Sequence, residues 1–394
     1  MAIAEHAIQS GAYSTQSITA STDVRDVSDM LDVWAHKWTP VLNRISWGGQ
    51  SGGLVGVEWL NEHLGFGYVQ TSAAIASNGT SFVLTTSGTG LTTAEVQKSM
   101  QPGTVLYAHV SGDGGGDAFM VITTIDTAGT ATISQMVATS EAIAASAKLY
   151  IVGSFANEGS DPFPDQSRAR TILSNNFNIL RRDVKITGSQ AASDMYAVDD
   201  ETRHQIAMRL LEMQFERERT VLYSYPQART STVAGYMQGF YGFLDGYSAQ
   251  AWVDTSTITL TEPAFNNLVS ECWDNGGQPS SFFANKDQIR KFTQWDQTRV
   301  RTQVDSRLAG HYTTRYLTDS GIEVELVPMR KAPPNLAFLI DTAQCHLRAK
   351  TGRKLLLEKL AKVGDYERWQ MLSEFTLEMR NYDMGHHGMF TELA

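Results

Sequence analysis

The chain has few cysteines and no long apolar run. Cys272 and Cys345 are the only two cysteines among 394 residues, too few for a disulfide framework, so buried thiols in a reducing compartment are the simpler reading. No apolar stretch approaches the ~20 residues that a membrane-spanning helix needs, and no basic-then-apolar signal pattern opens the sequence. We therefore expect a soluble protein that stays in the compartment where it is made.

Basic residues are also scarce. There are 32 Lys and Arg against 42 Asp and Glu, which gives a net charge of −10. Phosphate backbones repel such a chain, which argues against nucleic-acid binding as its main task. With 42% hydrophobic residues the chain can build sizeable cores, and its length favours two or three sub-domains.

Catalytic and metal-binding patterns are missing too. No H-E-x-x-H or paired-cysteine zinc pattern occurs, and His386–His387 has no ligand partners at suitable spacing, which favours a tail loop. The glycines of 112–117 are typical of a hairpin turn, because no Lys-Ser/Thr follows them as in a phosphate-binding loop. His204 and Cys272 have no evident catalytic partner. We assign no catalytic, cofactor or metal residue.

Residues 199–223 form the most regular segment, with no Gly or Pro and many helix-forming residues. One apolar stripe contains Ile206, Leu210 and Met213, and a second contains Ala207, Leu211, Phe215 and Leu222. Carboxylates at 199–201 suit the first turn, and Pro226 ends the pattern. The segment predicts a helix roughly 37 Å long, at 1.5 Å per residue.

Residues 68–156 have a different composition, rich in Thr, Ser, Ala and Gly with few charges. Short β-rich runs alternate there with turn signals, which predicts a small barrel or sandwich inserted into the host chain. The expected strands are 82–88, 104–110, 119–125, 130–137 and 148–153.

Two further segments, residues 1–24 and residues 168–190, are predicted to form arms. Residues 1–24 are rich in Ala, Ser and Thr and suggest an extended arm, followed by a short amphipathic helix over 26–38. Residues 168–190 carry a basic cluster, which favours a solvated or subunit-facing arm over a nucleic-acid patch, because Phe177 alone makes no aromatic platform.

The C-terminal half alternates helix and strand, which marks a compact α/β sub-domain. In this half, residues 235–247 are predicted to be a loop and residues 368–381 a half-buried strand. Earlier in the chain, residues 56–64 are predicted to be a strand or an exposed segment. The alternating elements are helices 261–274 and 286–295 and strands 280–285, 322–329 and 336–341.

The order of these parts resembles the major capsid protein of tailed bacteriophages, with the Hong Kong 97-type fold. WAHKWTPVLNRISWGGQ (34–50) with GVEWLNEHL (56–64) resembles the family's opening. NNFNILRRDVKITGSQAASDMY (175–196) resembles the return arm of the SU-ten-type major head protein, and LAKVGDYERWQMLSEFTLEMRN (360–381) resembles its C-terminal run. The inserted β segment lies outside the match.

The resemblance implies an α+β fold in four parts. Residues 1–47 would be an N-terminal arm, and 48–190 an E-loop region that carries the β insert of about 68–156. Residues 191–225 with 365–394 would form the P-domain, which contains the spine helix of about 199–223. Residues 226–364 would form the A-domain.

The implied function is a structural capsid protein of the virion, assembled in the host bacterial cytoplasm, and not an enzyme. Its copies would form hexamers and pentamers around double-stranded DNA without sequence-specific binding, with scaffolding, portal and decoration proteins as further partners and no membrane. An encapsulin-like compartment shell and a two-domain α/β enzyme are the alternatives. The candidate inter-subunit residues are Trp34, Trp38, Trp59, Arg168, Arg170, Arg181, Arg182, Lys185, Glu216, Arg217 and Arg219.

Overall fold

The computed structural model describes most of the chain from residue 39 onward. The described residues are 39–53, 55–62, 67–76, 79–85, 98, 100–109, 116–126, 129–137, 142–145, 147–161, 167, 170–193, 200–299, 315–330 and 332–394. The predicted arm 1–24, the predicted helix 26–38 and the candidates Trp34, Trp38 and Arg168 lie outside them.

A long five-stranded sheet is organised around strand β18 (Tyr366–Met379). On one side β18 pairs antiparallel with the whole of β10 (Asn178–Thr187), and on the other with β17 (Leu356–Lys359) and then β16 (Cys345–Ala349), which β1 (Ser46–Trp47) extends. The half-buried strand predicted here is wrong for the end of β18, because both faces are covered from Ser373 to Met379.

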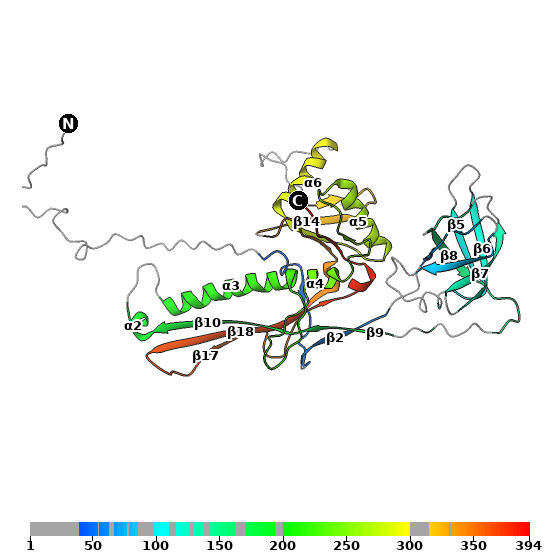
Figure 1. Ribbon diagram of the computed structural model, residues 1–394. Coiled ribbons are helices and arrows are strands. Elements are labelled where there is room, and N and C mark those ends of the chain that lie inside the picture. Colours follow the sequence, from blue (N-terminus) through cyan, green and yellow to red (C-terminus); the bar gives the residue numbers. More distant parts are fainter. Residues whose placement is uncertain are drawn as a thin grey trace, which may run out of the picture.

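The predicted long helix is confirmed as α3 (Glu201–Tyr223), which lies along β10 (Figure 1). Asp200 caps it by accepting hydrogen bonds from the N–H groups of Thr202 and Arg203. The Met213 stripe packs against β10 and β18 in one apolar cluster, as the 3.6-residue spacing predicts. A one-turn helix, α2 (Gly188–Ala191), follows β10 at the far end.

A six-stranded sheet with flanking helices α5 (Glu262–Asp274) and α6 (Lys286–Arg299) forms the second layer. These helices and the main strands of this sheet are as predicted from the αβαβ alternation. The strands, in spatial order, are β11 (Val253–Asp254), β19 (Gly388–Phe390), β15 (Ala337–Ile340), β12 (Ser281–Asn285), β14 (Glu323–Met329) and β13 (Arg315–Leu317).

Helix α4 (Phe240–Asp245) corrects the loop predicted for 235–247. The glycines of this stretch allow close packing instead of breaking the helix. A Cβ at Gly239 would lie 2.7 Å from the carbonyl oxygens of Thr220 and Val221, and one at Gly242 would lie 2.8 Å from that of Ser224. Glycine therefore brings α4 onto the end of α3, where Phe240 and Phe243 enter the main core.

A two-stranded ribbon of β2 (Gly56–Asn61) and β9 (Thr171–Asn176) connects the body to a closed barrel (Figure 1). The segment 168–190, predicted as an arm, thus forms the strands β9 and β10 where it is described. The predicted barrel strands are confirmed, and the short first strand was missed. The barrel strands are β3 (Tyr68–Thr71), β4 (Ser81–Thr85), β5 (Thr104–His109), β6 (Asp117–Ile125), β7 (Thr130–Val137) and β8 (Lys148–Ser154).

Strand pairing crosses the boundaries predicted for the sub-domains. β16 and β17, within the predicted 226–364 unit, join the long sheet through β18, whereas β19, within 365–394, joins the six-stranded sheet. The turn η2 (Tyr382–Met384) connects β18 to β19. The chain therefore passes between the two sheets more often than composition alone indicated.

Glu374, whose side chain is 2% exposed, holds three parts of this structure together. Its carboxylate lies 3.3 Å from Arg229, 3.6 Å from Lys350 and 2.7 Å from Arg353. These cations come from the loop after α3 and from the β16–β17 connection. A charge buried so deeply is tolerated because several cations surround it.

Replacing Glu374 with Gln should destabilise the subunit by on the order of 1–3 kcal/mol, because the charge-assisted bonds are lost. Denaturant unfolding of the purified subunit measures the change, and Glu358→Gln on the exposed β17 strand is the control. An unchanged unfolding midpoint in Glu374→Gln would show that the ion pairs with Arg229, Lys350 and Arg353 do not contribute to the stability of the subunit.

Candidate assembly interface

Ion pairs fix α3 on the β10 strand. Arg182 of β10 pairs with Glu216 and lies 3.9 Å from Glu212, which also pairs with Arg209 of the same helix. The structure thus brings together two sequence-predicted interface residues, Arg182 and Glu216, within one chain. Their side chains are about a third exposed, so the pair orients the helix and adds little stability.

Two further candidates are internal. Arg217 is 9% exposed and donates to Ser373 Oγ at 2.6 Å and to the carbonyl oxygen of Lys354 at 2.8 Å. Trp59 is 7% exposed and packs edge-on against Phe243, with ring centroids 6.3 Å apart. Both residues tie α3 and the ribbon to the body, so neither is available on the free surface of a subunit.

The remaining described candidates lie on open surface. Arg181, Lys185 and Arg219 are exposed, and Arg170 pairs with Glu62 at 2.9 Å. Lys185 Nζ lies 3.9 Å from the ring centroid of Tyr366 across the long sheet. These residues are dispersed over the segment before β9, over β10 and over α3, and they do not converge on one site.

The outer face of the ribbon contains two apolar side chains that nothing in the described chain covers, next to the polar pair Glu58 and Ser174. Val57 and Trp59 turn inward and join the main core, with Leu173 packed against them. On the opposite face Leu60 and Ile172 pair across the strands and are 62% and 64% exposed. This exposed apolar pair is a candidate contact surface for another molecule.

The second apolar stripe of α3 is similarly incomplete. Leu211 and Phe215 are partly exposed and belong to no core cluster of the described residues. The helix therefore packs on the long sheet with one stripe and leaves Leu211 and Phe215 of the other partly exposed.

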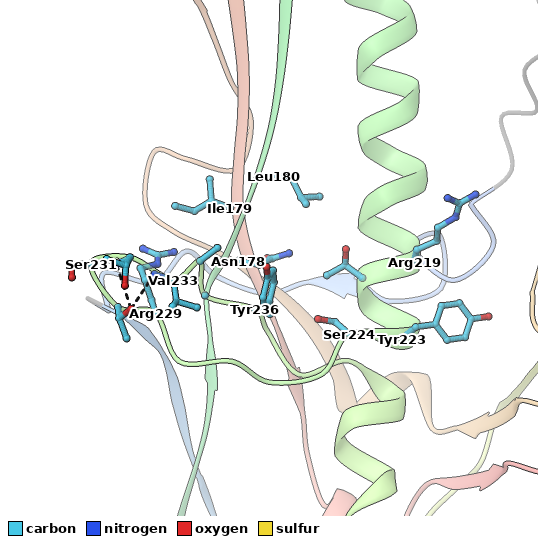
Figure 2. Close-up of a pocket in the computed structure, with 15 residues that line it drawn as sticks. Asn178, Ile179, Leu180, Arg219, Tyr223, Ser224, Arg229, Ser231, Val233 and Tyr236 are labelled. Carbon is cyan, nitrogen blue, oxygen red and sulfur yellow. Dashed lines mark hydrogen bonds between the residues drawn. The ribbon is translucent and has the colours of Figure 1, made fainter.

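A groove of about 650 Å³ lies between the start of β10, the end of α3 and the following loop (Figure 2). The loop folds back as a small hairpin, in which Gln227 and Tyr236 exchange backbone hydrogen bonds. Arg229 anchors the hairpin to Glu374 and to the carbonyl oxygen of Phe177. The groove is thus shaped by bonds within the subunit.

Asn178 lines this groove and is 3% exposed, yet neither its amide nitrogen nor its amide oxygen has a partner among the described residues. Figure 2 shows Arg219 and Tyr223 pointing away from the hairpin, whereas Ser224 points toward it. The sequence analysis missed this site, because a lone asparagine gives no pattern and the hairpin depends on contacts distant in sequence.

Glu218 of α3 fixes the chain segment that enters the body at residue 39. It is 9% exposed and accepts hydrogen bonds from the backbone N–H groups of Val41 and Leu42. Burial raises its pKa to about 7, against the opposing effect of these bonds and of nearby Arg44. Arg44 also pairs with Glu325 of β14 at 2.6 Å, which lowers the pKa of that carboxyl.

The described residues form no cluster of three or more His, Cys, Asp or Glu side chains suited to a metal ion, and no described helix is long and apolar enough to cross a membrane. Cys272 and Cys345 are buried, as predicted, and burial raises the pKa of both thiols. His387 lies in the loop before β19, as predicted, but it is fully buried. Its ring bonds to the carbonyl oxygen of Arg380, and burial lowers its pKa to about 4.

Comparisons place these features in a family. A family model described as SU10 major capsid protein matches residues 9–394. A solved chain of Mycobacterium phage Cain is 9% identical, with 97% of this chain and 99% of that chain covered and a TM-score of 0.48. A chain of the cyanophage A-1(L) capsid is 10% identical, with 96% and 99% covered and a TM-score of 0.48.

A chain of the holo-SrpI encapsulin complex from Synechococcus elongatus is 14% identical, with 59% of this chain and 78% of that chain covered and a TM-score of 0.41. No curated protein sequence matches. At these TM-scores the structural likenesses are distant, and the family model carries the assignment.

Glu218 predicts a pH effect with a defined sign. The pKa of Glu218 is higher in the folded subunit than in the unfolded chain, so between these two values folding takes up a proton. The contribution of Glu218 to the free energy of unfolding is therefore fully present below about pH 4.5 and is lost as the pH rises through 7. Glu218→Gln should flatten this loss between pH 5 and 8, as measured by thermal unfolding across pH.

Glu325→Gln is the matched comparison, because it touches the same segment with a lowered pKa. This substitution should lower the stability of the subunit at neutral pH. The difference in stability between the variant and the wild type should shrink as the pH falls below the ordinary pKa of a glutamate, 4.5. A wild-type pH profile identical to that of Glu218→Gln would contradict the assignment.

Proposed function

This chain belongs to the SU10 major capsid protein family, and we propose that its copies form hexamers and pentamers that close into the head of a tailed bacteriophage. As a member of this family it is a structural protein of the virion capsid and not an enzyme. The family match over residues 9–394 is the observation that carries this conclusion.

The shape of the subunit supports assembly into a shell. The long sheet with α3 and the ribbon with its barrel extend from the body in different directions (Figure 1). These extensions leave some apolar side chains exposed in a single copy, and contacts with other copies would bury them. The uncovered Leu60–Ile172 pair and the open α3 stripe are the surfaces that neighbouring copies would cover.

Strand pairing suggests a refined allocation of the proposed parts of a Hong Kong 97-type fold. The P-domain would comprise α3, β1, β10 and β16–β18, and the A-domain the six-stranded sheet with α4–α6 and β19. The rest of residues 1–47, without β1, would remain the N-terminal arm, and the ribbon with the barrel would be the E-loop, without β10.

The charge of −10 supports a wall that encloses double-stranded DNA without binding its sequence. Like charges on wall and genome keep the packaged DNA mobile during packaging and release. Scaffolding, portal and decoration proteins are the further partners that we propose for such a shell.

Replacing Leu60 and Ile172 with Asp should abolish or strongly reduce assembly while the subunit still folds, because both side chains are already exposed in the single copy. Light scattering and negative-stain microscopy measure particle formation, and circular dichroism checks the fold. Met136→Asp, at a barrel position that is 65% exposed, is the control.

Wild-type protein should form capsomers or closed shells tens of nanometres across. A monodisperse monomer or dimer that never assembles, even with crowding agents, would contradict the proposed function. Unchanged assembly of the Leu60→Asp/Ile172→Asp variant would contradict only the role of the ribbon.

A further inference from the structure

We propose that one outer face of the barrel binds a neutral saccharide, which lies over three aromatic rings and pairs its hydroxyl groups with a polar row beside them. The face is formed by β5, β6 and β8, and β5 pairs with both of the other strands. Binding of this kind needs no second copy, so the unassembled subunit should already show it.

Three aromatic side chains cross this face in one row. Tyr107 of β5 is opposite Tyr150 of β8 on one side and opposite Phe119 of β6 on the other. The ring centroid of Tyr107 lies 6.4 Å from that of Tyr150 and 5.2 Å from that of Phe119. The residue before each ring is buried in the barrel, so the alternation of a strand points all three rings outward.

A polar row lies directly beside the rings. Lys148, His109 and Asp117 each stand two residues from one of the rings along the same strand, which places them on the same face. Asp117 Oδ1 accepts a hydrogen bond from the Tyr107 hydroxyl at 2.9 Å and lies 3.1 Å from His109 Nδ1. The side chains of His109 and Asp117 are 66% and 57% exposed, and a carboxylate accepts more than two hydrogen bonds. A ligand on the rings therefore meets hydrogen-bonding groups at its edge.

This combination of rings and polar groups matches the chemistry of a sugar. Each pyranose residue has an apolar C–H face that packs on an aromatic ring, and hydroxyl groups at its edge that donate and accept hydrogen bonds. The two ring spacings are close to the length of one pyranose residue. A disaccharide or trisaccharide therefore spans the row.

Other ligands fit this face less well. Stacked nucleic-acid bases would bring phosphates, which Asp117 repels, and Lys148 is already paired with Asp274 at 3.3 Å. A protein that covered the rings would also remove Asp117 and His109 from water, which is costly unless the protein pairs them. Lys148 and Asp117 carry opposite charges, so the face favours a neutral ligand over a charged one.

Saturation-transfer NMR on the full-length, unassembled subunit tests binding. The neutral probes are maltotriose, cellotriose, chitotriose and mannotriose, and trigalacturonate is the acidic probe. We expect at least one neutral trisaccharide to bind with a Kd on the order of 1 mM, and trigalacturonate to bind more weakly. No binding of any neutral probe at millimolar concentration would overturn the site, and so would tighter binding of trigalacturonate.

Tyr150→Ala tests the row of rings. The substitution should weaken binding of the trisaccharide by about three- to tenfold, because one stacked ring is lost. Met136→Ala, at a β7 position that is 65% exposed, is the matched control, and circular dichroism checks the fold of both variants. Equal affinities in the two variants would show that the rings do not bind the ligand.

Asp117→Asn tests the polar row with a different readout. The side chain keeps its size but loses its charge, so the preference for the neutral trisaccharide over trigalacturonate should decrease. An unchanged preference would overturn the role assigned to Asp117.

A label on the otherwise unaltered subunit locates the ligand, including the case in which Tyr150→Ala fails to fold. Fluorine NMR of 3-fluorotyrosine protein should show the Tyr107 and Tyr150 signals shifting as the trisaccharide is added. Tyr236, which is 52% exposed on the 227–236 hairpin, should not shift. A shift of Tyr236 without shifts of the two barrel rings would place the ligand elsewhere and overturn the proposal.

Two results separate this site from assembly. Loss of shell formation in Tyr150→Ala, with no sugar bound by the wild type, would show that another copy covers the face and would overturn the saccharide. A wild-type subunit that binds the trisaccharide but never assembles would refute the proposed function and leave this site supported.

Discussion

The pairing of β18 with β10 is the interaction on which the rest of the subunit depends. Ten residue pairs join the two strands, from Asn178 opposite Phe375 to Thr187 opposite Tyr366. Helix α3 lies on β10, while β16 and β17 extend the sheet from the other edge of β18. The buried Arg217 and Glu374 then fasten the helix and two loops to this strand.

This arrangement explains why the subunit has open surfaces. A long two-layer extension of helix and sheet has few side chains that are covered from every direction. Apolar positions such as Leu211, Leu60 and Ile172 consequently remain partly or largely exposed in a single copy. The barrel, by contrast, closes its own edges and has its own apolar core, to which Met384 of η2 also contributes. A thin ribbon joins it to the body, and Lys148 of the barrel also pairs with Asp274 of α5.

The sequence predicted the elements whose periodicity is local. The 3.6-residue stripes of 199–223 and the alternating runs of the barrel gave the correct helix and strands, because local burial determines both patterns. The prediction was wrong where tertiary contacts override local signals. Gly239 and Gly242 read as loop residues but serve close helix packing. The loop predicted at His387 is correct, but its burial against the carbonyl oxygen of Arg380 depends on contacts that no local pattern shows.

The interface was less predictable. Charge and aromatic content selected Arg217 and Trp59, which the structure places inside the subunit. The groove depends on Asn178, Arg229 and Glu374, which are far apart in sequence, and no spacing rule relates them. The family resemblance indicated the class of protein, and only the fold showed which side chains lack partners.

Hydrogen–deuterium exchange on unassembled subunits and assembled particles tests the central claim most directly. The account predicts that assembly slows exchange in the ribbon strands β2 and β9, while the interior strands β12 and β15 are equally protected in both states. Ribbon amides that exchange at the same rate before and after assembly would contradict it.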